Sequence, residues 1–487
     1  MNYSKPTRPR AGFSKRVLHA ACGLAALALT ATAFIHSALA QRPVYFRHDG
    51  GLAADDKQSL PDELDPRQAI WKQSLPNGNS TPTIVGNRIF LTAHEGQELL
   101  TLCLDRDTGK ELWRHGIRVE ALEKVHNEGS PADATVACEG QRVFAFFGSY
   151  GLLCYDLEGK PLWTKKLGPF RDEFGSASSP ILADGKIILS EDHDLDSFVI
   201  AVRQDNGETL WQTSREGFTR SYATPVVWKT GGRTQLVVAG SLQLVAYDLD
   251  SGVPLWSVDG FARIVNTTPV VAGDTLYVAT WSPGGDSDAR IAMEPWETAL
   301  SLWDKNKDSR LQGEELPAGE VRSRFFRIDL DGNQTLDVVE WGKYARIFEL
   351  AQNAVVALRP DPSGGTPRTA WEYNRGIPYV ASPLVYRDQV VLVKDGGIIT
   401  TLTAADGKLT KQIRARDAAR YYSSPVAGDD KIYVASVDGV VTVLRAPPRL
   451  EIISSHDFGE RIAATPVLSD GRIYLRTASA LYCFANR

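Results

Sequence analysis

Two twelve-residue stretches of the 487-residue chain place oxygen-bearing side chains at alternating positions, and this spacing suits a hard divalent cation. The first stretch runs from Asp304 to Glu315 and the second from Asp329 to Glu340. Ca²⁺ takes about six to eight oxygen ligands, and alternation around a tight loop directs them at one point. In the first loop the predicted ligands are the side chains of Asp304, Asn306, Asp308 and Glu315, the carbonyl of Arg310, and Gln312 directly or through water. In the second loop they are the side chains of Asp329, Asp331, Asn333, Asp337 and Glu340 and the carbonyl of Thr335.

The duplication of this pattern predicts an EF-hand pair. Leu311 and Leu336 both occupy the eighth loop position, so we expect them to join the loops through a short strand contact. Both loops carry a residue other than glycine at the sixth position, Ser309 and Gln334, where a left-handed turn costs on the order of 1 kcal/mol. Extracellular calcium sites commonly bind at about 10⁻⁴ to 10⁻³ M, which favours a structural ion over a sensor.

The calcium loops interrupt a sequence that otherwise repeats. A Ser/Thr-Pro pair recurs at Thr81, Ser179, Thr224, Thr268, Ser382, Ser424 and Thr465, and Thr135-Val136 occupies the one missing position. Successive spacings are 54, 44, 45, 44, 114, 42 and 41 residues. A unit of about 40 to 50 residues therefore recurs eight times, with one long insertion in the fifth copy.

Each unit reads as four short strands separated by turn residues, which predicts an all-β fold, an eight-bladed β-propeller. The last unit lacks its fourth strand, and residues 67–75 supply a matching pattern that should close the eighth blade and leave no free edge. The predicted divisions are an N-terminal extension over 41–66, blades one to four and the start of blade five over 67–280, the EF-hand insertion over 281–353, and the remaining blades over 354–487.

The tryptophans and cysteines of the repeat read as packing residues. Tryptophans end the fourth strands, as at Trp113, and are expected to wedge adjacent blades. Cys103, Cys154 and Cys483 share a third-strand position that other units fill with alanine, and Cys138 has no obvious partner. We therefore expect small buried thiols and no disulfide.

The first forty residues predict an exported protein. Five basic residues precede an apolar run from Ala20 to Ile35, and Ala38-Leu39-Ala40 provides a cleavage pattern. Loss of this signal segment changes the formal net charge from −5 to −10, which disfavours binding to nucleic acid and anionic lipid. The alternative is an uncleaved anchor, although about 16 apolar residues are short for a bilayer span. The expected location is periplasmic or extracellular, with no integral span after cleavage.

The loops on one face of the propeller form the predicted channel mouth, because connections from fourth to first strands and from second to third strands emerge together. The candidate ligand-binding residues there are Arg220, Tyr222, Arg263, Tyr379, Arg420, Tyr421 and Arg461. Arginines with aromatic neighbours suit a planar anionic ligand. The alternative is that these arginines pair with Asp172, Glu173 and Glu460 and tie loops together. The acidic hairpin over 191–196 is expected to be a solvated turn, and a second metal site is the alternative.

The repeat, with Asp105-x-x-Thr-Gly-Lys-x-Leu-Trp113 as its clearest copy, resembles the pyrroloquinoline-quinone-type repeat of bacterial propellers over nearly the whole mature chain. Segments such as Phe218-Thr219-Arg220-Ser221-Tyr222 look like a bacterial secreted family with this repeat and an inserted EF-hand. Two better-known groups share the repeat: quinoprotein alcohol dehydrogenases, and the propeller lipoprotein of outer-membrane protein assembly.

The two groups imply different functions. The first implies pyrroloquinoline quinone held over calcium, a catalytic Asp and a disulfide between adjacent cysteines, and this chain has no Cys-Cys pair. The second implies protein partners and no quinone. We expect a calcium-binding scaffold that presents its mouth to a protein or a small anionic ligand. The alternative is a quinone-dependent dehydrogenase that oxidises an alcohol or sugar.

Overall fold

The computed structural model describes residues 1–3, 42–123, 125–172 and 174–486 and divides into two compact units, Met1–Arg42 and Pro43–Arg487. The predicted signal segment and its cleavage pattern lie outside the described residues, apart from residues 1–3. No helix within these described ranges is both long and apolar enough to cross a membrane.

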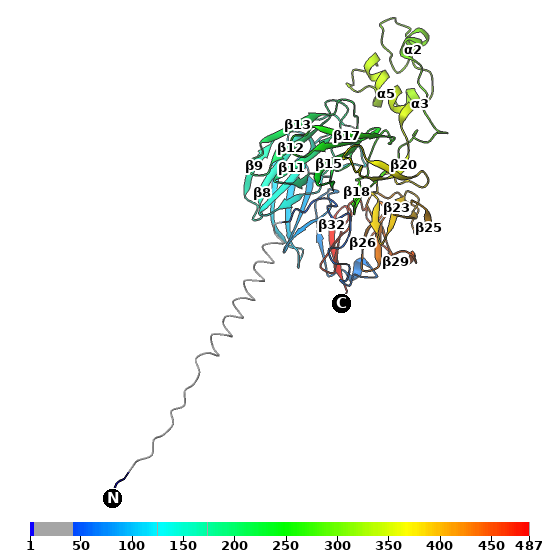
Figure 1. Ribbon diagram of the computed structural model, residues 1–487. Coiled ribbons are helices and arrows are strands. Elements are labelled where there is room, and N and C mark those ends of the chain that lie inside the picture. The colour runs from blue at the N-terminus through cyan, green and yellow to red at the C-terminus, as the bar shows by residue number, and fades with distance from the viewer. Residues whose placement is uncertain (4–41, 124, 173, 487) are drawn as a thin grey trace. The chain divides into compact units, whose positions relative to one another are not determined.

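The described part of Pro43–Arg487 forms eight four-stranded antiparallel sheets, which confirms the predicted eight-bladed propeller (Figure 1). Blade one contains β2 (Thr83–Val85), β3 (Arg88–Glu95), β4 (Glu98–Asp105) and β5 (Glu111–Arg118). Blade two contains β6 (Ala137–Glu139), β7 (Arg142–Phe147), β8 (Gly151–Asp156) and β9 (Pro161–Lys165). Blade three contains β10 (Ile181–Ala183), β11 (Lys186–Glu191), β12 (Phe198–Arg203) and β13 (Thr209–Ser214). Blade four contains β14 (Val226–Thr230), β15 (Arg233–Gly240), β16 (Gln243–Asp248) and β17 (Pro254–Asp259).

The second half repeats the pattern, and the N-terminal strand completes it. Blade five contains β18 (Val270–Ala272), β19 (Thr275–Thr280), β20 (Ala354–Arg359) and β21 (Arg368–Tyr373). Blade six contains β22 (Leu384–Tyr386), β23 (Gln389–Lys394), β24 (Ile398–Thr403) and β25 (Leu409–Arg414). Blade seven contains β26 (Val426–Gly428), β27 (Lys431–Ala435), β28 (Val440–Arg445) and β29 (Glu451–Asp457). Blade eight joins β30 (Val467–Ser469), β31 (Arg472–Arg476) and β32 (Ala480–Ala485) to β1 (Trp71–Ser74). The predicted closure is therefore confirmed, and it leaves β32 with a partner on both edges.

Outer-strand tryptophans join neighbouring blades, as the sequence predicted. Trp113 of β5 donates a hydrogen bond to the carbonyl of Leu157 in blade two, at 3.0 Å. Its ring also covers Gly159, where a Cβ atom would come within 2.7 Å of it. Gly159 has a φ of 88°, so the turn itself requires glycine there as well. The same contact recurs for Trp163, Trp211 and Trp371 with the carbonyls of Gln204, Leu249 and Ala404.

The insertion between β19 and β20 holds most of the helices among the described residues. They are α2 (Trp296–Trp303), α3 (Glu320–Ser323), α4 (Phe325–Ile328) and α5 (Val338–Leu350), and Figure 1 shows α2, α3 and α5 gathered in one group. Two 3₁₀ turns, η1 (Pro66–Gln68) and η2 (Gly148–Tyr150), lie outside the insertion. The core of the insertion includes Trp341, Tyr344 and Phe348 from α5 and continues into Leu242 of the β15–β16 turn. The insertion is therefore packed against blade four.

Candidate functional site: a channel mouth beneath paired acidic loops

The Ser/Thr-Pro repeat builds a closed ring of hydrogen bonds around the channel. The backbone N–H of each repeat residue donates to the hydroxyl of the equivalent residue in the next blade, at 2.9–3.4 Å. The circuit ends where the Thr465 N–H donates to the Thr81 hydroxyl, at 3.1 Å. We call these eight residues the hydroxyl ring. They are Thr81, Thr135, Ser179, Thr224, Thr268, Ser382, Ser424 and Thr465.

The hydroxyl ring lines a central cavity of about 200 Å³. The other lining residues include aromatic, acidic and amide side chains, namely Phe46, Asn79, Glu128, Asp133, Phe174, Tyr222, Asn266, Tyr379 and Tyr422. Asp133 accepts hydrogen bonds from Asn79 Nδ2 and Ser130 N, at 2.8 and 2.9 Å, and burial raises the pKa of its carboxyl to about 6. The cavity therefore offers hydroxyls, aromatic faces and two carboxylates.

An N-terminal segment runs beside this cavity, and its Phe46 is among the lining residues. Val44 and Cys138 of β6 exchange two backbone hydrogen bonds, both at 2.8 Å. Ala53 donates to the carbonyl of Ala427 in β26, and the Ala427 amide donates to the carbonyl of Gly51. Between these attachments the Arg47 guanidinium binds the carbonyls of Gly50, Pro383 and Pro425, at 2.7–3.0 Å. Residues 44–53 thus connect blade two with blade seven.

Three of the four candidate arginines are held by other groups of the mouth. Arg220 is buried in an ion pair with Asp194, with 2.8 Å between Nη2 and Oδ2. Arg420 pairs with Glu128, and Arg461 donates to the backbone carbonyl of Glu128 at 2.8 Å. These contacts tie loops together through Asp194 and Glu128. Asp172 binds Tyr222, Glu460 accepts from Thr477 and Ser479, and Glu173 lies outside the described residues.

The candidate tyrosines divide into two groups. Tyr222 and Tyr379 line the central cavity together with Tyr422. Tyr421 was wrongly placed there, because it is 1% exposed within the core of blades six and seven, and its hydroxyl donates to the Asp417 carbonyl at 2.9 Å. Neighbouring residues of an extended segment point to opposite sides, so Tyr422 faces the cavity and Tyr421 faces the core.

The acidic hairpin between β11 and β12 is not a solvated turn, contrary to expectation. Glu191, Asp192, His193 and Asp194 are 1–3% exposed. Asp192 forms a two-fold ion pair with Arg215, at 2.6 and 2.8 Å, and Asp194 holds Arg220. Charged side chains are rarely buried unless they are paired. The sequence of the hairpin did not indicate that arginines in the connection between β13 and β14 would pair with these carboxylates.

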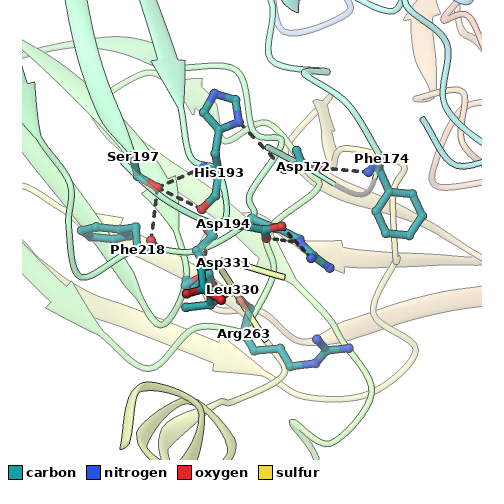
Figure 2. Close-up of polar contacts among 12 residues, drawn as sticks. Asp172, Phe174, His193, Asp194, Ser197, Phe218, Arg263, Leu330 and Asp331 are labelled. Atoms are coloured by element: carbon teal, nitrogen blue, oxygen red, sulfur yellow. Dashed lines mark hydrogen bonds and ion pairs between the residues drawn. The ribbon is translucent and has the colours of Figure 1, made fainter. Parts of the chain in front are cut away.

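His193 lies between two buried carboxylates. Its Nε2 is 3.2 Å from Glu191 Oε2, and its Nδ1 is 4.0 Å from Asp172 Oδ2. Figure 2 shows the imidazole directed toward Asp172, which also accepts a hydrogen bond from the Phe174 amide at 2.8 Å. Burial raises the pKa of Asp172 to about 7. The hydroxyl of Tyr222 donates to the same carboxylate at 2.7 Å, so this cluster adjoins the central cavity.

The second acidic loop brings its carboxylates together. Among the described residues, Asp329, Asp331 and Glu340 each offer an oxygen, and these oxygens all lie within 4.8 Å of one another. Asp329 Oδ1 is buried without a hydrogen-bond partner among the described residues. Asp337 caps α5 and forms a capping box with Glu340, which also accepts from the Leu330 amide at 2.7 Å. An inward-facing, unpartnered carboxylate oxygen fits an oxygen-preferring cation.

The first acidic loop satisfies more of its own polar groups. Asp308 Oδ2 accepts from Asn306 Nδ2 and from Gln312 Nε2, at 3.0 and 2.8 Å. Glu315 accepts from the amides of Lys305 and Gln312, at 2.9 and 3.0 Å. The Arg310 side chain donates to Thr335 Oγ1 at 3.0 Å and so links this loop to the second.

The two loops are joined as predicted. Leu311 and Leu336 exchange backbone hydrogen bonds at 3.1 and 2.8 Å. Asn333 belongs to the second loop and accepts from the Thr335 amide at 2.8 Å. The sixth-position residues Ser309 and Gln334 have φ values of 63° and 69°, so both occupy the strained left-handed region.

Helix α5 connects the second loop to the channel mouth. Its Lys343 donates to the Glu216 carbonyl at 3.1 Å, and its buried Tyr344 lies within electrostatic reach of Arg220 and Asp194. Gly332 of the second loop lies directly against the Arg171 guanidinium. The loop and the mouth therefore share an interface.

The sequence analysis considered two cofactors, Ca²⁺ and pyrroloquinoline quinone, and the structure offers them different ligand groups. The carboxylates of the second loop suit Ca²⁺, as described above. The central cavity is lined by Glu128 and Asp133, and no arginine is among its described lining residues. This lining offers an anionic quinone no cationic clamp within the cavity, so the described lining does not fit pyrroloquinoline quinone.

Two features of the site were not found from the sequence. The Ser/Thr-Pro spacing predicted the repeat. It did not predict that the hydroxyls of these residues would form a ring of hydrogen bonds. The crossing of residues 44–53 left no periodic signal, because only Val44 and the stretch from Gly51 to Ala53 pair with strands.

The sequence of the repeat is similar to that of known proteins. A family model described as outer membrane protein assembly factor BamB matches residues 100–329 and 351–487. A protein of that name from Yersinia pestis is 22% identical over 403 residues, covering 76% of this chain and 87% of its own length.

Solved structures show the same fold. The crystal structure of BamB from Moraxella catarrhalis superposes with a TM-score of 0.53 and 14% identity, over 86% of this chain and 99% of that one. Quinohemoprotein alcohol dehydrogenase from Comamonas testosteroni gives a TM-score of 0.50 and 12% identity, over 89% and 79% of the two chains. The family match covers most of the repeat on both sides of α5, and the chain therefore belongs to the family of pyrroloquinoline-quinone-type repeat propellers described as outer membrane protein assembly factor BamB.

Proposed function

We propose that this chain is an exported propeller scaffold that binds Ca²⁺ in its insertion and presents its channel mouth to a protein partner. The observation that carries this proposal is the position of the second acidic loop. Its three carboxylates converge and include the unpartnered Asp329 Oδ1, and α5 runs directly from Glu340 to the mouth. An ion held there would fix the start of α5 and, through Tyr344 and Lys343, the surface beside the Arg220–Asp194 pair.

The family supports the scaffold part of the proposal, since the relatives' names describe a factor in outer membrane protein assembly. A protein of that kind acts by contact with other proteins, and a rigid ring of blades provides a stable platform for such contact. The predicted signal segment agrees with a location outside the cytoplasm, where calcium at about millimolar concentration saturates a weak site.

The calcium part is tested by thermal unfolding of the chelator-treated mature chain. Calcium at about 100 times its dissociation constant should stabilise the protein by about 2.7 kcal/mol, provided that the unfolded chain does not bind it. Glu340→Gln should abolish this response, and Glu315→Gln should reduce it. Glu349→Gln, on the exposed end of the same helix, is the matched control and should respond like the wild type. A wild-type protein that does not respond to calcium would refute the calcium site.

The scaffold part is tested separately with the immobilised chain and a fraction of exported proteins. A specific partner should be retained in calcium, released by chelator, and retained poorly by Glu340→Gln. A partner bound equally by the wild type and by Glu340→Gln would show that the insertion does not organise the binding surface.

A further inference from the structure

Arg263 differs from the other buried arginines of the mouth. It lies in the connection between β17 and β18, and its side chain is 4% exposed overall. Its Nε donates to the backbone carbonyl of Pro283 at 3.2 Å. Its terminal nitrogens have no hydrogen-bond or ion-pair partner among the described residues.

The charged side chains described around Arg263 are other arginines, of which Arg324 pairs with Glu320. The described charged side chains that act on it are Arg324, between α3 and α4, and Arg327, on α4. The remaining neighbours are the phenols of Tyr344 on α5 and Tyr379 beside the cavity. Burial lowers the pKa of Arg263, and the two arginines lower it further.

Neighbouring buried arginines show what is missing at this position. Arg215 holds both oxygens of Asp192, and Arg220 holds both oxygens of Asp194. Removing a guanidinium from most of its water without a counter-charge carries a desolvation cost. This cost is offset where an anion binds, and the planar fork of arginine matches a carboxylate in two parallel hydrogen bonds.

We propose that Arg263 anchors a carboxylate-binding site between the propeller mouth and the insertion, and that the ligand is an Asp or Glu side chain of a bound protein segment. The inference rests on the proposed scaffold function and names the chemistry by which the partner is recognised. Ile264, Asn266 and Tyr379 lie beside Arg263 and also line the central cavity, which gives the ligand a route of approach. The phenols of Tyr344 and Tyr379 provide further donors and aromatic contact.

The experiment measures binding of two short capped peptides to the calcium-loaded chain by calorimetry. The peptides are identical except that one contains Glu and the other Gln. The wild type should bind the Glu peptide, and Arg263→Gln should weaken this binding about thirtyfold or more. Arg263→Lys should retain part of it. Arg416→Gln, an exposed arginine in the connection between β25 and β26, is the matched control and should bind like the wild type.

Stability provides a second readout. With no carboxylate in the buffer, Arg263→Gln should unfold at the same temperature as the wild type or higher, because it removes an uncompensated buried charge. The Glu peptide should raise the unfolding temperature of the wild type and leave that of Arg263→Gln unchanged.

Several results would overturn the inference. They are equal binding of the two peptides, equal affinity of the wild type and Arg263→Gln, or tighter binding of inorganic phosphate than of the Glu peptide. A fall in the unfolding temperature of Arg263→Gln, together with stronger peptide binding by Glu173→Gln, would mean that the chain supplies its own counter-ion. The calcium response is measured on every variant, so a wild type that responds to calcium but does not prefer the Glu peptide refutes the carboxylate site alone.

Discussion

The propeller and its insertion hold short elements together by different means. In the propeller, each blade binds the next through a neutral backbone-to-hydroxyl hydrogen bond and, in several blades, a tryptophan that covers a glycine turn. In the insertion, short helices flank two acidic loops, and the carboxylates of the second loop lie close to one another. Repetition satisfies the polar groups of the blades within the chain, whereas the converging carboxylates of the second loop leave Asp329 Oδ1 without a partner among the described residues. We therefore expect calcium to change the stability of the insertion and not that of the blades.

The largest expected effect is on the stability of the propeller. Trp113→Ala removes the wedge between blades one and two and should lower the free energy of unfolding by about 3 kcal/mol. The loss should be the same with calcium and with chelator. Leu112→Ala, at the neighbouring outward-facing position, is the control and should change stability by no more than about 0.5 kcal/mol. Chemical denaturation measures both, and a calcium-dependent loss in Trp113→Ala would contradict the separation of the two regions.

The next effect tests the hydroxyl ring. Ser382→Ala removes the acceptor of the buried Thr268 amide and should cost about 2 kcal/mol, because that N–H is left unsatisfied. Ser363→Ala, in the exposed turn between β20 and β21, serves for comparison. Thermal unfolding is the measurement. If Ser382→Ala proved as stable as the wild type, the ring would be a geometric consequence of the repeat and no source of stability.

The third prediction concerns Asp172, which lies beside Arg171 at the interface between the two regions. Burial raises the pKa of its carboxyl to about 7, so the folded state favours the protonated form. Relative to Asp172→Asn, the wild type should therefore lose stability as the pH rises from about 4 to about 7, and it should lose no more above that range.

A pH series of unfolding temperatures measures this effect. The two proteins should match near pH 4, and Asp172→Asn should be the more stable of the two near pH 8. The exposed Asp196 supplies the control, since Asp196→Asn should show no such trend. A constant difference between Asp172→Asn and the wild type at every pH would mean that the carboxyl titrates normally.

The smallest expected effect is on the stability of the insertion. Gln334 has a left-handed backbone conformation, which glycine adopts without strain. Gln334→Gly should therefore stabilise the insertion by about 1 kcal/mol. Trp341 packs in the core of the insertion, so tryptophan fluorescence during unfolding follows the change. Ser309→Gly is the equivalent substitution in the first loop. A destabilised Gln334→Gly would show that the side chain makes a contact worth more than the strain.

The architecture was predictable because its signals are local and repeated. The Ser/Thr-Pro spacing, the four short strands per unit and the fourth-strand pattern over 67–75 require only neighbouring residues to be read correctly. The pairing of Leu311 with Leu336 was predictable for the same reason, since twelve-residue loops bring their eighth positions to equivalent places. The site was less predictable, because its residues come from loops on different blades.

The chain's own sequence determined the number of blades, the closing strand, the place of the insertion and the residues of the two acidic loops, because each follows from periodicity or spacing along the chain. Only the tertiary structure decided the partners of the buried charges. Arg220 pairs with Asp194, Tyr421 faces the core while Tyr222 faces the cavity, and Arg263 is left without a carboxylate among the described residues. The energy of a buried charge depends on what lies within a few ångströms of it, and in a closed ring of blades those neighbours are distant in sequence.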